Sequence, residues 1–240
     1  MTVLVLPASS GISPRYFTYL TAAMAVLTLV YVLYLAARWT GYWNGEMEWA
    51  DEPGSRTVFV GGQAFEVPVN MIRTPAHRLG VKQPGEHLST LHLGVLWPSM
   101  SGFEKNKADQ FAAFGEGSNV VLLDIGRNAR GETMRDRLDP VYRRLARGKE
   151  GTGPAGLKVL TLSSPIGARD QIVYEPGSET GFIARCRQSL SSTIAICTAQ
   201  RELSDGLLLT YRFEEALLAN WGRLERRAVE LVRTLEIGKN

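Results

Sequence analysis

The amino-acid sequence predicts an α+β fold with one amino-terminal transmembrane helix, a mostly antiparallel sheet packed with helices, and a long carboxy-terminal helix. Three observations lead to this prediction. Residues 16–37 carry no charge, short β-prone runs follow one another between residues 57 and 213, and apolar residues recur at spacings of three and four between Leu217 and Leu235. Helices gathered on one face of an antiparallel sheet make an α+β architecture.

The uncharged stretch is long enough to cross a membrane. Its 22 residues rise by about 1.5 Å each, which gives about 33 Å and exceeds a hydrocarbon core of about 30 Å. Aromatic side chains prefer the membrane interface, and they flank the stretch on both sides. The predicted interface anchors are Tyr16, Trp39, Tyr42, Trp43 and Trp49.

We expect a single-pass protein of the bacterial inner membrane with its amino terminus in the cytoplasm. The expected segments are a cytoplasmic leader (1–15), a transmembrane helix (16–38), an interfacial tether (39–56) and a periplasmic α+β domain (57–240). The charge bias that sets orientation is weak, because only Arg15 and Arg38 flank the span. The alternative is a cleaved signal peptide, whose apolar region is usually about 7–15 residues long. This stretch is longer, so we favour an anchor.

The two cysteines, Cys186 and Cys197, both lie in the expected outer domain. An even number of closely spaced cysteines is typical of an oxidising compartment, and we expect one disulfide. It would close a loop of about 12 residues and stabilise the fold by about 3 kcal/mol on the chain-entropy account. The alternative is two buried thiols in a cytoplasmic domain.

The expected sheet begins with a hairpin. Residues 57–60 and 63–67 are β-prone, and Gly61-Gly62 between them suits a two-residue turn. Two further strands are expected after the hairpin, one at 88–97 with its odd-numbered residues buried and one at 120–125. Five more β-prone runs form a meander in the second half, at 157–162, 171–175, 182–187, 194–202 and 207–213.

Helices are expected at three places in the outer domain. Ser101 and Glu104 have the spacing of a capping box before a short helix that reaches Phe114. Apolar residues on one helical face predict a second helix within 134–145, where Asp139 suits a cap. The carboxy-terminal helix has heptad-like spacing for only about three heptads, so we favour packing on the sheet over a coiled coil.

Catalytic motifs are absent from the sequence. The three histidines, His77, His87 and His92, show no metal-binding spacing, and we interpret them as surface or rim residues. The glycine-rich stretch 148–153 lacks the order of a phosphate-binding loop, and no serine stands in a G-x-S-x-G motif. We therefore predict no catalytic residue, no metal site and no cofactor, with an envelope hydrolase as a minor alternative.

Arginines cluster around one predicted helix and form the best candidate patch for an anion or a protein partner. Guanidinium groups bind carboxylates and phosphates, although a solvated helix face with interleaved acidic residues is the alternative. The patch consists of Arg127, Arg130, Arg135, Arg137, Arg143, Arg144 and Arg147. Apart from Arg15 and Arg38, the chain has 25 basic and 24 acidic residues. This near-neutral balance argues against nucleic-acid binding.

Several segments together resemble a bacterial family of small single-span inner-membrane proteins with a two-cysteine periplasmic domain. They are VPVNMIR at 67–73, residues 91–103 with Trp97-Pro98, ARC at 184–186, TYRF at 210–213, and Trp221. The resemblance covers most of the outer domain. It implies the topology and a disulfide, and it carries over no catalytic residue.

These observations favour a non-enzymatic accessory or scaffold subunit of a cell-envelope assembly. The expected partners are the lipid bilayer and other envelope proteins, and a homodimer through the small residues Thr21, Ala25 and Thr28 of the span is left open. The alternative is a periplasmic binding module for an anionic lipid or glycan, which would use the arginine patch.

Overall fold

The structure is a computed structural model that describes residues 14–43, 49–78, 87–112, 117–163, 168–190 and 192–238. The chain divides into two compact units, Met1–Met47 and Glu48–Asn240, and each is described by itself.

The first unit contains the helix α1 (Pro14–Trp43). Within it, Arg15–Ala36 has a mean hydropathy of 2.0 and is long and apolar enough to cross a membrane. Tyr16 is exposed on this helix. The other predicted anchors, Trp39, Tyr42 and Trp43, lie in its last turns, and their side chains fall outside the described part of the chain. The helix therefore extends into the segment predicted as a tether.

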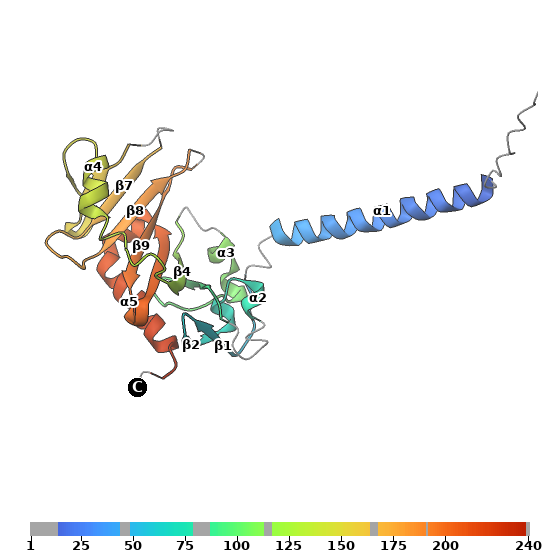
Figure 1. The fold of residues 1–240 in the computed structure, drawn as a ribbon, viewed down its shortest axis with the longest axis horizontal. Coiled ribbons are helices and arrows are strands. Elements are labelled where there is room, and N and C mark those ends of the chain that lie inside the picture. The colour runs from blue at the N-terminus through green and yellow to red at the C-terminus, as the bar shows by residue number, and fades with distance from the viewer. Residues whose placement is uncertain are drawn as a thin grey trace, which may run out of the picture. The chain divides into compact units, whose positions relative to one another are not determined.

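The second unit is an α+β domain, as the sequence predicts (Figure 1). A two-stranded sheet is made by β1 (Ser55–Val60) and β2 (Gln63–Pro68), and the expected Gly61-Gly62 turn joins them. An eight-stranded antiparallel sheet has the order β3-β4-β10-β9-β8-β7-β6-β5. Its strands are β3 (Thr90–Leu96), β4 (Val120–Arg127), β5 (Gly151–Thr152), β6 (Lys158–Thr161), β7 (Asp170–Tyr174), β8 (Ile183–Gln188), β9 (Ala195–Glu202) and β10 (Leu207–Glu214).

Helical segments connect and cover these strands. The α-helices are α2 (Pro75–Arg78), α3 (Ala108–Ala112), α4 (Arg143–Leu145) and α5 (Trp221–Leu235). The 3₁₀ turns are η1 (Val69–Met71), η2 (Lys105–Lys107), η4 (Pro154–Gly156), η5 (Ser204–Gly206) and η6 (Glu215–Asn220), and η3 (Leu138–Tyr142) is a single π-helical turn. The glycine-rich stretch 148–153 and the residues after it thus contain a short edge strand and a 3₁₀ turn.

One face of the large sheet carries the main core. Odd-numbered residues of β3, β4 and β10, such as Leu93, Leu123 and Tyr211, are fully buried there. The helix α5 packs on this face through Leu224, Ala228, Val232 and Leu235, and the hairpin contributes Phe65 to the same core. Packing on the sheet was the favoured prediction for the carboxy-terminal helix, and it is confirmed.

The other face of the sheet has two smaller apolar clusters at its two ends. Over β6–β8, the connection 134–142 covers Ile172, Tyr174 and Ile183. Over β3 and β4, Phe111 of α3 and the partly buried Trp49 and Phe103 cover Leu96, Val120 and Leu122. Trp49, predicted as a membrane-interface anchor, is therefore part of the domain core, where its ring lies 4.6 Å from that of Phe111.

Two predicted helix starts are wrong. The turn at residues 97–100 brings Ser101 back against Leu96, whose N–H donates to the Ser101 carbonyl at 2.9 Å, so Ser101 cannot cap a helix. The helical segment begins instead at Lys105. Asp139 lies inside the π-turn and accepts a hydrogen bond from Arg143 at 2.6 Å, so it does not act as a cap. Phe114 lies outside the described residues.

A substitution of Gly94 tests the packing of Trp49. A Cβ atom at position 94 would collide with the Trp49 ring, whereas a Cβ at Gly222 in α5 would meet only the Arg226 guanidinium at 3.6 Å. We expect Gly94→Ala to lower the free energy of unfolding by about 1–3 kcal/mol. The matched control Gly222→Ala should leave it unchanged or raise it by up to about 1 kcal/mol, as measured by urea unfolding of the full chain. Equal effects of the two changes would contradict the packing described for Trp49.

Candidate functional site

Between the two apolar clusters lies a strip of sheet whose side chains are polar and half-buried. We call it the open strip, and it consists of His92, Asp124, Thr210, Arg212, Thr198 and Arg185. These residues come from β3, β4, β10, β9 and β8, which are adjacent in the sheet. Their side chains share one face because they pair across the strands, as His92 does with Asp124 and Arg212 with Thr198.

The strip's charged groups are held in place by contacts within the sheet. The Nδ1 of His92 lies 2.6 Å from one oxygen of Asp124, and Arg212 Nη2 donates to the other oxygen at 3.1 Å. A carboxylate only accepts hydrogen bonds, so Nδ1 of His92 carries the proton. The side chains of His92 and Arg212 remain 39% and 38% exposed, while that of Asp124 is 19% exposed. The carboxylate thus orients two accessible side chains, the imidazole of His92 and the guanidinium of Arg212.

The three histidines separate into a pair and a single residue. His77 stacks on His92 with ring centres 6.0 Å apart, and burial together with the neighbouring His92 lowers the pKa of His77. His87 instead lies edge-on to Phe59, 5.9 Å between ring centres. His77 and His92 therefore lie closer together than their spacing in the sequence suggests, and Asp124 is the partner that sequence reasoning missed. In the part of the chain that the structure describes, no group of three metal-ligating residues is found.

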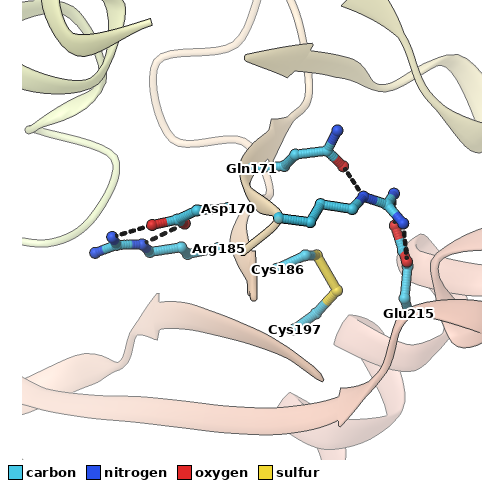
Figure 2. The surroundings of a disulfide bond; sticks show 7 residues. Asp170, Gln171, Arg185, Cys186, Cys197 and Glu215 are labelled. Carbon is cyan, nitrogen blue, oxygen red and sulfur yellow. Dashed lines mark hydrogen bonds and ion pairs between the residues drawn. A yellow bond between two sulfur atoms is a disulfide. The ribbon is translucent and has the colours of Figure 1, made fainter. Parts of the chain in front are cut away.

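The disulfide lies on the core side of the same strands. Cys186 of β8 and Cys197 of β9 are directly opposite each other and bonded, as the sequence predicts. Next to Cys186, Arg185 points to the strip and donates to both oxygens of Asp170, at 2.8 and 2.5 Å (Figure 2). This hydrogen-bonded pairing raises the pKa of Arg185. The disulfide therefore fixes the two strands that carry Arg185 and Thr198.

The seven arginines of the predicted patch do not share one helix. They run from the end of β4 through the connection to α4 and just beyond it. Arg135 donates to the carbonyl oxygens of Glu175 and Ser178 and lies over the Tyr174 ring. Arg143 donates to Asp139, Glu150 and the Tyr174 hydroxyl. The exposed members are Arg127, Arg130, Arg143, Arg144 and Arg147.

A separate cavity of about 580 Å³ lies beside α5. It is lined by α5 on one side and by residues 201–204 and 207 on the other, with Phe65 at its floor. Glu225 of α5 lines it with a side chain that is 14% exposed. Burial raises the pKa of Glu225, and the nearby Arg201 opposes this effect. The hydroxyl of Tyr211 is fully buried, and its pKa is raised well above the usual value by burial and by the Glu225 charge.

The raised pKa makes stability depend on pH. A carboxyl group whose pKa is higher in the folded state favours folding at low pH, and this contribution is lost as the pH rises through the folded pKa. We expect Glu225→Gln to increase the free energy of unfolding at neutral pH by about 1 kcal/mol, because the amide buries no charge. The difference from the native chain should vanish towards about pH 4, as measured by urea unfolding across pH. A difference independent of pH would contradict the assignment.

Comparison with known proteins shows that the fold of this chain is similar to that of a solved structure. No protein-family model and no curated protein matches the chain. The chain is similar in structure to Smlt3025, an immunity protein of the Stenotrophomonas maltophilia type IV secretion system. The alignment covers 77% of this chain and 94% of that chain, with 12% sequence identity and a TM-score of 0.52. At this level of identity the two proteins share a fold, and the family resemblance predicted from the sequence stays a prediction.

Proposed function

We propose that this chain is a single-span protein of the bacterial inner membrane whose periplasmic domain binds another protein through the open strip. The proposed form of binding is that of an immunity protein, which occupies its partner and keeps it inactive. The observation that carries the proposal is the row of accessible polar side chains, His92, Arg212 and Arg185, each oriented by a carboxylate on a sheet face that is covered at both ends. In this proposal the amino terminus is cytoplasmic and the role is one of binding rather than catalysis.

The open strip has the size and the chemistry of an interaction surface. Five adjacent strands at a spacing of about 4.8 Å give it a width of about 19 Å. A typical interface buries about 800 Å² on each partner, so the strip is wide enough to form the centre of one. Arginine is enriched among the residues that dominate binding energy. Because Asp124 and Asp170 already hold Arg212 and Arg185, little side-chain entropy remains to be lost on binding.

Two further features support an envelope location. The candidate span and the disulfide together fit a membrane-anchored domain in an oxidising compartment. The fold shared with a secretion-system immunity protein is consistent with a protein that meets another protein at the cell envelope. A carboxy-terminal alkaline phosphatase fusion, which is active only in the periplasm, would test the orientation, and an inactive fusion would contradict it.

Site-specific photo-crosslinking in living cells tests the proposed surface. A photoreactive amino acid at Thr198, in the strip, should give one discrete adduct with another protein. The matched control at Thr152, exposed on the edge strand β5, should give none. The captured protein, exported to the periplasm without this chain, should slow growth, and co-expression of the chain should restore it. Equal adducts at both positions would contradict the strip as the binding surface.

The second candidate is binding of an anionic lipid or glycan by the exposed arginines of the patch. Arg144 and Arg147 are its best test positions, because Arg143 also bonds to Asp139, Glu150 and Tyr174. If the patch binds such a ligand, Arg144→Glu with Arg147→Glu should abolish binding of the phosphatidylglycerol headgroup, added as soluble glycerophosphoglycerol, to the full chain in detergent. Such a change should leave the crosslink at Thr198 intact.

A further inference from the structure

The cavity beside α5 lies on the opposite side of the sheet from the open strip and is independent of the proposed partner surface. Its volume of about 580 Å³ falls within the usual range for small-molecule sites, about 300–1,000 Å³. Phe65, Leu207 and Val229 supply apolar lining. Among the described residues, four glutamates and three arginines also line it.

The Glu225 carboxylate is incompletely satisfied for a group with so little exposure. Its Oε1 atom is buried and accepts no hydrogen bond from the described residues. The nearest counter-charge is Arg201, whose Nη1 lies 3.9 Å away and donates to the Thr180 carbonyl at 2.6 Å. The buried Tyr211 hydroxyl likewise has no partner among the described residues. Buried polar groups in folded proteins normally have partners, and the Glu225 carboxylate, which only accepts hydrogen bonds, still lacks a donor.

We propose that this cavity binds a small organic cation, an ammonium or guanidinium group on a short alkyl chain, with Glu225 as the counter-charge. The alkyl chain would contact Leu207 and Val229, and the cation would pair with the Glu225 carboxylate, which Arg201 approaches only to 3.9 Å. A neutral or anionic ligand of the same shape would leave the carboxylate without a counter-charge, so the site should select for positive charge.

Binding of hydrophilic amines to the purified full chain in detergent tests this proposal. The probes are 1,4-diaminobutane and agmatine, and butane-1,4-diol is the neutral control, each measured by thermal shift and calorimetric titration. We expect both amines to bind and to raise the melting temperature, and the diol to do neither. No heat of binding and no shift with either amine would overturn the proposal, as would equal binding of the diol.

Three variants locate the binding within the cavity. Glu225→Gln should weaken amine binding by about 10- to 100-fold, because it removes a charge-assisted hydrogen bond. Glu132→Gln, exposed and outside the cavity lining, is the matched control and should change affinity by less than about threefold. Val229→Phe fills the apolar part of the cavity and should block binding while leaving Glu225 in place. Unchanged affinity in Glu225→Gln, or a loss in Glu132→Gln as large as that in Glu225→Gln, would show that the amines bind elsewhere.

Discussion

Replacing Arg212 by alanine is expected to weaken the complex with the protein partner by about 30- to 1,000-fold. Truncation of a central interface arginine typically costs about 2–4 kcal/mol, and each 1.4 kcal/mol is a tenfold change in affinity. Arg212 lies in the middle of the open strip, is half-exposed, and is oriented by Asp124. The measurement is the dissociation constant of the full chain in detergent for the crosslinked partner.

The control for this prediction is Arg227→Ala. Arg227 is exposed on α5, which packs on the opposite face of the sheet, so its removal should change the affinity by less than about threefold. Both variants should keep the free energy of unfolding of the native chain within about 1 kcal/mol, because Asp124 in Arg212→Ala still has His92 as a partner. Equal losses of affinity in the two variants would place the binding surface elsewhere.

Removing the disulfide is expected to lower the free energy of unfolding of the outer domain by about 3 kcal/mol. The bond closes a short loop between neighbouring strands, and the loss of this constraint stabilises the unfolded chain. The double variant Cys186→Ala with Cys197→Ala is suitable because both side chains are buried in the apolar core. Urea unfolding of the full chain measures the difference.

The native chain in reducing conditions is the matched control for the double variant. Reduction breaks the same bond without removing atoms, so both samples should be destabilised by similar amounts. The double variant should be slightly less stable because alanine leaves small cavities in the core. Stability that is unchanged by reduction would mean that the strands are held by packing alone. The strip should also bind its partner more weakly without the bond, because β8 and β9 carry Arg185 and Thr198.

Local sequence patterns predicted most of the architecture. The Gly61-Gly62 hairpin, the five strands of the meander, the cysteine pair and the helix against the sheet all follow from period, turn residues and spacing. The local sequence pattern gave wrong predictions where contacts between distant parts of the chain decide the structure. Ser101 has a capping-box spacing, yet its backbone pairs with Leu96, and Trp49 follows a membrane span, yet it packs against Phe103 and Phe111.

The candidate site was harder to predict than the fold. His92, Asp124, Arg212 and Arg185 are far apart in the sequence, and they meet because β10 returns to lie between β4 and β9. The only sign of the site in the sequence was a single polar residue at an even-numbered position in each of three apolar strands. The order of the strands, which brings these residues together, cannot be read from local sequence. The sequence favoured the arginine patch instead because its members are close in sequence, although Arg135, Arg137 and Arg143 bond to neighbouring groups in the fold.

The native mass of the full chain after gentle extraction from its own membranes is the most direct test of whether the open strip binds a protein partner. We expect a stoichiometric complex with one different protein, which persists in Arg227→Ala and is lost in Arg212→Ala. A chain that is found only alone or as a homodimer, with the same mass distribution in both variants, would contradict the claim that the open strip binds a protein partner.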